Sequence, residues 1–420
     1  MATRRPAGGV GRATWPHVAP RRGGGGRYGH TSPPAAEGVG ARRTAGASGG
    51  RLAGMDQATG DRDRRDGDPQ DGTPHEGEPQ DATPPHDGGR PGARPGDVEA
   101  GRPDPQDPAV GVRLEARQIT SPLAHHGEGP VWDERAGALR WVDMLRGDLL
   151  SWRLPEGWDG ERAADADVER HHLGDVLAVV RPREQGGFVV ALERCLALLD
   201  EGELGRVPPR RLPDVWDDPT IRFNEGACDP QGRFYAGSMA YDAREGAATL
   251  YRLDPDHSVR VVLEDLTISN GLAWSPDGSC AYYHDTPTQR LWRLVVDEAG
   301  EVVDRRSLRE TPEERGGPDG LAVDEEGCVW AALFGGSAVQ RISPEGELLA
   351  VVDVGARQVT ACAFGGPDLA DLFITTSAEG LEEADPDADP AADRDDDPLA
   401  GALFTVRPGV RGLPVRPFAG

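Results

Sequence analysis

Four side chains that carry oxygen stand immediately before a glycine, at widely separated points of the chain. They are Glu128, Glu225, Asn270 and Asp319, and Asn224 adjoins the second of them. Carboxylate and amide oxygens are the ligands of hard cations such as Ca²⁺, Mg²⁺ and Mn²⁺, and a carboxylate also binds Zn²⁺. Asn-Gly and Asp-Gly are common in turns, so one such dipeptide alone indicates only a turn. Four of them at equivalent places of a repeating fold predict a cation site.

The elements that would bring these positions together are repeated units of short strands. From about residue 111 the chain consists of strand-like runs that end in Asp/Pro/Gly turns, with little helical periodicity. Equivalent positions recur about 40–50 residues apart, a spacing typical of propeller blades and not of a sandwich or an α-solenoid. These positions are Val131, Val179, Ala227, Ala273, Ala322 and Ala361. We therefore predict an all-β fold, a six-bladed β-propeller over residues 111–420.

The ring of such a fold needs a closing strand. Residues 112–119 precede the first unit and are expected to supply it, which would remove the exposed sheet edges. Between residues 379 and 397 the chain is strongly acidic, and we interpret this run as a solvated surface loop in the sixth unit. A calcium-binding loop is the alternative, although the run lacks the spacing of an EF-hand.

Residues 1–110 form a low-complexity tail. They are rich in Gly, Pro, Asp and Arg and poor in large apolar residues, so they cannot bury enough surface to offset their ordering entropy, and we predict disorder. The composition changes from Arg-rich to acidic at Met55. Our hypothesis is that Met55 is the true start and that residues 1–54 are upstream sequence. N-terminal mass spectrometry of the native protein tests it, and a peptide covering residues 42–51 would contradict it.

The charge and cysteine content exclude several classes of protein. The formal net charge is −26 at pH 7, which argues against nucleic acid or an anionic membrane as a partner. A basic arm in residues 1–54 is the one feature that could bind nucleic acid, but it has no periodicity. No run approaches the ~18 apolar residues of a membrane span. The five cysteines are widely spaced in apolar runs, so we expect reduced, buried side chains and a cytoplasmic location.

Several ordered motifs together resemble the SMP-30/gluconolactonase/LRE-like (regucalcin) family. They are GEGPVW at residues 127–132, RFNEG at 222–226, GRFYAG at 232–237, ISNGL at 268–272 and PDG at 318–320. The resemblance covers about residues 114–420. It implies a six-bladed propeller that hydrolyses sugar lactones with a divalent metal ion, which could be Ca²⁺, Zn²⁺, Mn²⁺ or Mg²⁺.

The resemblance also assigns roles to individual residues. It implies that Glu128, Asn270 and Asp319 are the metal ligands and that Arg222 and Asn224 face the substrate. Asp242 stands where the family has a Glu that contacts substrate, and it is shorter by a methylene group. The implied partner is a small sugar lactone.

These residue types fit the hydrolysis of an activated cyclic ester. A divalent ion polarises the carbonyl group or lowers the pKa of a bound water. Asp319 would accept the proton of that water, and Arg222 with Asn224 would orient ring hydroxyls or stabilise the oxyanion. The sequence holds neither a Gly-x-Ser-x-Gly elbow nor a phosphate-binding fingerprint, so neither a serine hydrolase nor an organic cofactor is predicted. The alternatives are a hydrolase of other lactones or esters and a non-catalytic calcium-binding or partner-binding propeller.

Three further polar groups carry weaker signals. His125 and His126 could coordinate a metal, but we interpret them as flanking the entrance to the first unit. His171 and His172 are expected on an outer strand. Asp285 follows a strand and is a candidate for a position beside the metal ligands.

Overall fold

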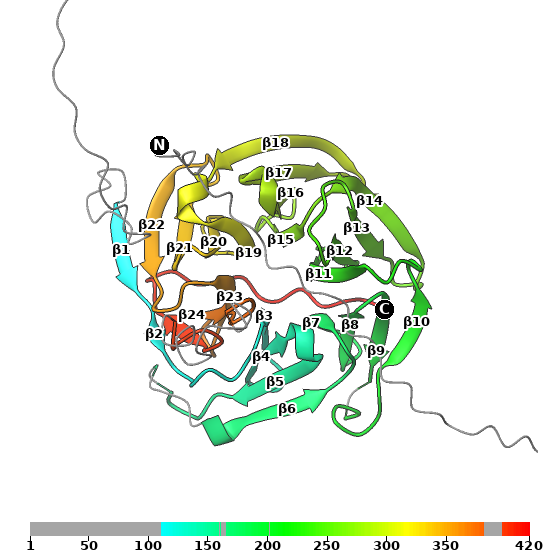
Figure 1. The fold of residues 1–420 in the computed structure, drawn as a ribbon, viewed down its shortest axis with the longest axis horizontal. Helices are drawn as coiled ribbons and strands as arrows, with labels where there is room; N and C mark the ends of the chain where they lie inside the picture. Colours follow the sequence, from blue (N-terminus) through cyan, green and yellow to red (C-terminus); the bar gives the residue numbers. More distant parts are fainter. Residues whose placement is uncertain (1–110, 159, 161–164, 201, 382–396) are drawn as a thin grey trace, which may run out of the picture. The chain divides into compact units, whose positions relative to one another are not determined.

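The computed structural model describes residues 111–158, 160, 165–200, 202–381 and 397–420, and these residues form six β-sheets arranged around a central axis (Figure 1). The predicted disordered tail, the Met55 start and most of the acidic loop lie outside the described residues. Helical structure within the described ranges is limited to four short 3₁₀ turns. They are η1 (Met144–Arg146), η2 (Asp165–Asp167), η3 (Thr286–Thr288) and η4 (Glu313–Arg315). The predicted all-β, six-bladed propeller is confirmed.

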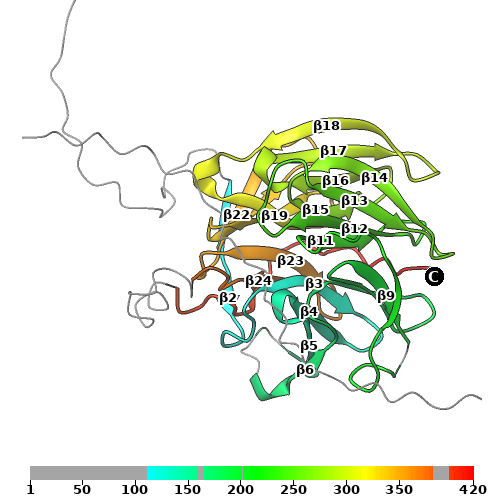
Figure 2. The same cartoon turned by 45° about the vertical axis from the view of Figure 1, so that its right-hand side comes forward.

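The first four sheets are simple up-and-down meanders that step outward from the axis, as the first and fourth sheets show in Figure 2. The first sheet contains β3 (Gly127–Asp133), β4 (Ala138–Asp143), β5 (Asp148–Arg153) and β6 (Val168–His172). The second contains β7 (Leu177–Pro182), β8 (Phe188–Leu192), β9 (Cys195–Leu199) and β10 (Arg210–Asp214). The third contains β11 (Ile221–Cys228), β12 (Phe234–Ala240), β13 (Ala248–Leu253) and β14 (Val259–Leu266). The fourth contains β15 (Ser269–Trp274), β16 (Cys280–Asp285), β17 (Arg290–Val296) and β18 (Val302–Glu310).

The last two sheets both take strands from the start of the described chain. The fifth contains β19 (Gly317–Val323), β20 (Val329–Phe334), β21 (Ala338–Ile342), β22 (Leu348–Asp353) and β1 (Val112–Glu115). The sixth contains β23 (Val359–Gly365), β24 (Asp371–Thr376), β25 (Phe404–Val406) and β2 (Arg117–Gln118). The predicted closing strand is therefore β2, which pairs antiparallel with β25. The first half of the same segment, β1, instead pairs parallel with β22 and covers the edge of the fifth sheet.

The innermost strand of every sheet carries an irregularity at the same place. In each of the six, the pairing register with the neighbouring strand shifts partway along. A bulge of this kind bends a strand and re-aims its side chains. In β11, β15 and β19 the shifted residues include Asn224, Asn270 and Asp319, and in β3 the shift directly follows Glu128. The repeated motif of the sequence is thus a repeated bulge.

Aromatic side chains fill the wedges between neighbouring sheets. Trp330 on β20 makes an edge contact with Phe364 on β23, with ring centroids 5.8 Å apart, and Tyr235 on β12 packs against Trp274 on β15 at 5.1 Å. Such pairs bury large apolar areas and fix the angle between blades. All five cysteines are buried and unpaired, as expected from their spacing. Among the described residues, no helix has the length and hydropathy to cross a membrane.

After β25 the chain crosses the ring and ends on the opposite side (Figure 1). The N–H of Gly412 donates to the carbonyl of Leu369, and the N–H of Phe418 donates to the carbonyl of Pro182 at 2.9 Å. Phe418 itself is fully buried in the core of the second and third sheets. This C-terminal segment, residues 412–420, is therefore anchored at both of its ends.

Candidate active site

A cavity of about 50 Å³ lies in the channel at the beginning of the inner strands. Its wall combines five of the six side chains predicted to bind metal or substrate with His126, which carried a weaker signal, and with residues for which the sequence predicted no such role. The predicted ones are Glu128, Arg222, Asn224, Asn270 and Asp319, and the others are His126, Met239, Tyr241, Ala243, Ile268, Phe334 and Glu379. Residues from the first, third, fourth and fifth sheets therefore converge on one point, as the matched positions implied.

Two neighbouring residues on β11 face different cavities. Asn224 lines the candidate site, whereas Glu225 lines a second cavity and accepts a 3.4 Å contact from Arg181 Nη2. The expectation that Glu225 belongs to the oxygen ring, based on its place before glycine, is corrected in favour of Asn224. Both residues lie in the register shift of β11, and the bulged backbone directs the two side chains to different cavities. The sequence holds the deciding signal in the offset of three residues that separates Asn224 from Ala227, Asn270 from Ala273 and Asp319 from Ala322.

Asp242 lies outside the wall of the cavity, although both of its neighbours line it. Its carboxylate accepts a hydrogen bond of 2.9 Å from Arg244 Nη1, and its side chain is about half exposed. Tyr241 occupies the wall instead, and its hydroxyl donates to Glu193 Oε1 at 2.8 Å. A substrate contact by Asp242 stays a prediction from the resemblance alone.

Two carboxylates of the site are buried, and neither forms an ion pair with a cationic side chain of the described residues. Glu128 is 4% and Asp319 is 5% exposed. Burial raises the pKa of Glu128 well above its usual value, and the charges of Asp319 and Glu225 raise it further. Burial and the charge of Glu225 raise the pKa of Asp319 in the same way. Two such groups favour a bound cation strongly, because it would offset both their desolvation and their repulsion.

Asn270 presents an acceptor that nothing in the described chain satisfies. Its Nδ2 donates to Thr286 Oγ1 at 3.0 Å, and Thr286 Oγ1 donates in turn to the carbonyl of Pro318 at 2.8 Å. These bonds fix the amide, and its Oδ1 is left buried with no hydrogen-bond partner among the described residues. Buried acceptors are rarely left unpaired, so an orphan oxygen beside two buried carboxylates fits a metal ligand.

The donor set is two carboxylates and two amides, which are hard oxygen ligands. Within the described ranges no three His, Cys, Asp or Glu side chains gather as a metal cluster, so the amides are needed to complete this set. Oxygen donors of this kind suit Ca²⁺, Mg²⁺ and Mn²⁺. The residues present therefore fit the divalent ion that the sequence predicted.

Arg222 supplies the positive side of the site. Its Nη1 donates to Asn224 Oδ1 at 2.7 Å, and Asn224 Nδ2 donates to the carbonyl of Ser269 at 3.1 Å. The Nε of Arg222 is buried and has no hydrogen-bond partner in the part of the chain described. Arg222 is thus held in place with a donor still available to an oxygen atom.

His126 and Asp285, which carried weaker signals in the sequence, lie in different places relative to the cavity. His126 lines the cavity, with its Nδ1 2.8 Å from Ser377 Oγ and 3.1 Å from Glu379 Oε2. Burial lowers the pKa of His126 even though Glu379 opposes this. Asp285 lies outside the wall and accepts the N–H of Ile268 at 2.9 Å, which fixes the chain just before β15. The expected outer-strand position of His171 and His172 is confirmed by β6.

The described residues define the class of the protein as a six-bladed propeller with carboxylate and amide side chains at one end of its channel, and the comparisons identify the family. Residues 126–378 match the family described as SMP-30/Gluconolactonase/LRE-like region. The chain belongs to this family, as its motifs predicted. It is 40% identical over 300 residues to a 6-deoxy-6-sulfogluconolactonase of Pseudomonas putida, a match that covers 70% of this chain and 95% of the relative.

Two further comparisons agree with this assignment. Regucalcin of Danio rerio is 34% identical over 299 residues, covering 70% of this chain and 95% of its own. The crystal structure of a calcium-binding protein, regucalcin, from Agrobacterium tumefaciens superposes with a TM-score of 0.65 at 26% identity, over 74% of this chain and all of that chain.

Proposed function

We propose that this protein hydrolyses sugar lactones with one divalent metal ion held by Glu128, Asn270 and Asp319. The observation that carries the proposal is the Oδ1 of Asn270, which has no hydrogen-bond partner among the described residues and shares a cavity with two buried carboxylates and Arg222. Relatives named 6-deoxy-6-sulfogluconolactonase and, in Bacillus subtilis, putative sugar lactone lactonase support the substrate class.

The side chains of the cavity divide the work of ester hydrolysis. A bound divalent ion supplies Lewis acidity to the carbonyl group or to water. Asp319 lines the cavity, and its carboxylate would accept a proton from the attacking water. The free Nε–H of Arg222 donates to a substrate oxygen, which stabilises negative charge as it develops. Asn224 is already bonded to Arg222, so it holds the guanidinium group in this orientation.

A panel of lactones and metals tests the proposal. The chain is stripped with a chelator and assayed with sugar lactones in the presence of Ca²⁺, Zn²⁺, Mn²⁺ or Mg²⁺, with acid release as the readout. We expect ring opening that depends on metal and is restored by at least one of the four ions. If no combination opens any lactone, the enzyme assignment fails.

The second candidate function is a non-catalytic calcium-binding propeller, because a solved relative is described as a calcium-binding protein. Arg222 separates the two functions, since metal binding alone needs no oxyanion donor. If Arg222→Gln keeps Ca²⁺ affinity and loses lactone hydrolysis, the chain is an enzyme. We also propose a cytoplasmic location, supported by the five free, buried cysteines, which are typical of proteins in reducing compartments.

A further inference from the structure

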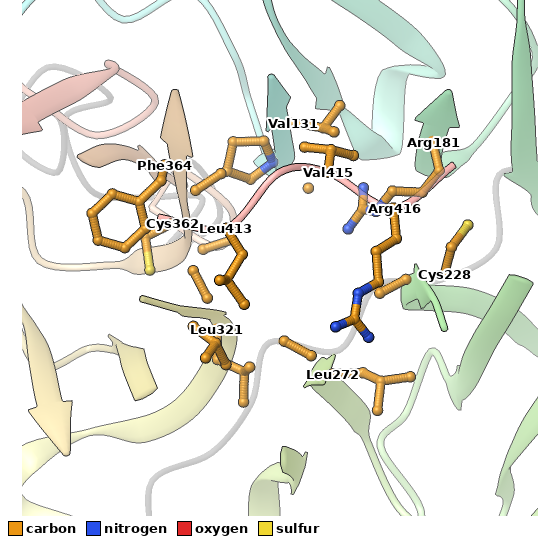
Figure 3. Close-up of a pocket in the computed structure, with 18 of the residues that line it drawn as sticks. Val131, Arg181, Cys228, Leu272, Leu321, Cys362, Phe364, Leu413, Val415 and Arg416 are labelled. Atoms are coloured by element: carbon orange, nitrogen blue, oxygen red, sulfur yellow. The ribbon is translucent and has the colours of Figure 1, made fainter. Parts of the chain in front are cut away.

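A second cavity of about 140 Å³ occupies the other end of the channel (Figure 3). The early residues of the inner strands line the candidate active site, whereas later residues of the same strands, such as Val131, Leu272 and Leu321, line this second cavity. Residues 413–416 of the C-terminal segment form another part of its wall. We call it the far cavity.

The wall that the C-terminal segment provides is firmly held. Beyond residues 413–416, the N–H of Phe418 donates to Pro182 O at 2.9 Å and the N–H of Ala419 donates to Gly232 O at 2.8 Å. Before them, the N–H of Gly412 donates to Leu369 O at 2.8 Å. The far cavity is therefore a built feature of the fold and not a space beside a loose terminus.

Two guanidinium groups point into the far cavity, from Arg181 on β7 and from Arg416 on the C-terminal segment (Figure 3). Arg181 has one carboxylate contact, at 3.4 Å from Glu225. Arg416 Nη2 donates to the carbonyl of Ser275 at 3.1 Å. Its Nη1 is buried with no hydrogen-bond partner, and no carboxylate of the described residues lies within ion-pair distance of Arg416. With two arginines and one glutamate, the polar part of the cavity carries a net positive charge.

The remaining wall is largely apolar. It includes Val131, Leu272, Leu321, Phe364, Leu413 and Val415 (Figure 3). The volume is close to the roughly 150 Å³ of an apolar cavity that accommodates benzene. The space thus suits a molecule with a compact apolar body and a single anionic group. Burial lowers the pKa of Arg416, although the charges of Asp229 and Asp277 oppose this shift.

We propose that the far cavity binds a small organic carboxylate, whose carboxylate group bonds to Arg416 and Arg181 and whose apolar body packs against Leu272 and Leu321. Arginine suits this task because its fork of donors matches the two oxygens of a carboxylate. The site is separate from the lactone site, which lies at the other end of the channel and has two carboxylates of its own. The ligand therefore differs in chemistry from a neutral, polyhydroxylated lactone.

Isothermal titration calorimetry of the full chain with benzoate tests the proposal, with benzamide as the neutral probe of the same shape. We expect saturable binding of benzoate at one site and at least about tenfold weaker binding of benzamide, because a buried cation is left unpaired by the amide. Arg416→Gln should weaken the binding of benzoate by a similar factor. Arg411→Gln is the matched control, since Arg411 is exposed and does not line the cavity.

Two further variants keep the test decisive if Arg416→Gln alters the C-terminal segment. Ala322→Leu fills part of the cavity without removing either arginine, and it should also weaken benzoate. Arg222→Gln, in the candidate active site, should leave benzoate binding unchanged. Absence of saturable binding, equal binding to Arg416→Gln, or loss of binding in Arg222→Gln would each overturn the proposal.

Discussion

The two ends of the channel are made from the same inner strands, yet they differ in almost every physical property. At the candidate active site the strands present carboxylates and amides, whereas at the far cavity they present mainly Val, Leu, Ala and Cys side chains. The register shift in each inner strand separates the two ends. In β3, β11, β15 and β19 the residues before or at the shift include the polar groups of the candidate active site, and beyond the shift these strands pair regularly and present mainly apolar groups.

This difference shows how one repeated strand serves two purposes. Regular pairing beyond the bulge gives a stiff frame, which the anchored C-terminal segment reinforces. The bulges then tolerate buried carboxylates that are costly without a cation. Substitutions at the candidate active site should therefore mainly lower activity, and substitutions near the far cavity should mainly lower stability.

The largest effect is expected from Asp319→Ala, which removes a carboxylate from the active end. Lactone hydrolysis should fall by more than about 10²-fold, the upper range for residues that only support a metal ligand. The measurement is kcat/KM with the best metal, together with circular dichroism to confirm the fold. Asp304→Asn on the outer strand β18 is the control and should keep full activity. Activity retained in Asp319→Ala would remove this residue from the site.

A large loss of stability is expected at the far end from Phe418→Ala. The side chain is fully buried, so the free energy of unfolding should fall by about 3–5 kcal/mol. Urea denaturation measures this change. Val261→Ala on β14 is the control, because Val261 is exposed and its truncation should cost less than about 0.5 kcal/mol. Equal stability of the two variants would show that the C-terminal segment does not brace the ring.

A pH effect of moderate size is expected from His284, whose Nδ1 lies 2.7 Å from the carbonyl oxygen of Asp319. Burial lowers the pKa of His284 from 6.5 to about 4. As the pH falls below 6.5 the unfolded chain takes up a proton first, so stability decreases between pH 6.5 and about 4. The expected loss between pH 7 and pH 5 is about 2 kcal/mol.

Urea denaturation of the wild type and of His284→Gln at both pH values isolates this group. The buried carboxylates Glu128 and Asp319 have raised pKa values and act in the opposite direction, but they are present in both proteins. The free energy of unfolding of His284→Gln should therefore fall less between pH 7 and pH 5 than that of the wild type, because the variant lacks the titration of His284. Identical pH dependence in the two proteins would contradict the role of His284.

The smallest effect is expected from Asp242→Ala. The side chain is exposed and lies outside the cavity wall, so kcat/KM should change by no more than about twofold. Tyr241→Phe alters a residue of the cavity wall and serves as the comparison. It should change KM more than Asp242→Ala does. A tenfold loss in Asp242→Ala would instead show that Asp242 reaches the substrate, as the family resemblance implies.

The prediction of the fold from sequence depended on local signals that are independent of packing. Turn residues and the spacing of Val131, Val179 and Ala227 are set along the chain, so they revealed the number of blades. Residues 112–119 were predicted as one closing strand, but only β2 closes the ring, whereas β1 pairs parallel with β22 of the neighbouring sheet. No local pattern specifies which of two neighbouring sheets such a strand will join.

The prediction of the site was best where the repeat supplied the geometry. Glu128, Asn270 and Asp319 were expected to converge because equivalent blade positions lie at one height in the channel, and all three line one cavity. Tyr241 and Glu379 were missed because they come from segments between inner strands, where no repeat fixes the direction of a side chain. His126 was noticed, but its contact with Glu379 joins the first and sixth sheets and was not foreseeable.

The sequence by itself determined the number of blades, the family and the chemical types that line the active end, because a repeat converts spacing along the chain into position around the axis. Only the tertiary structure decided that Asn270 keeps an oxygen with no hydrogen-bond partner among the described residues, and that Arg416 of the C-terminal segment lines the same cavity as Arg181. Those outcomes depend on bulge geometry and on packing between distant segments, which follow from the folded ring as a whole.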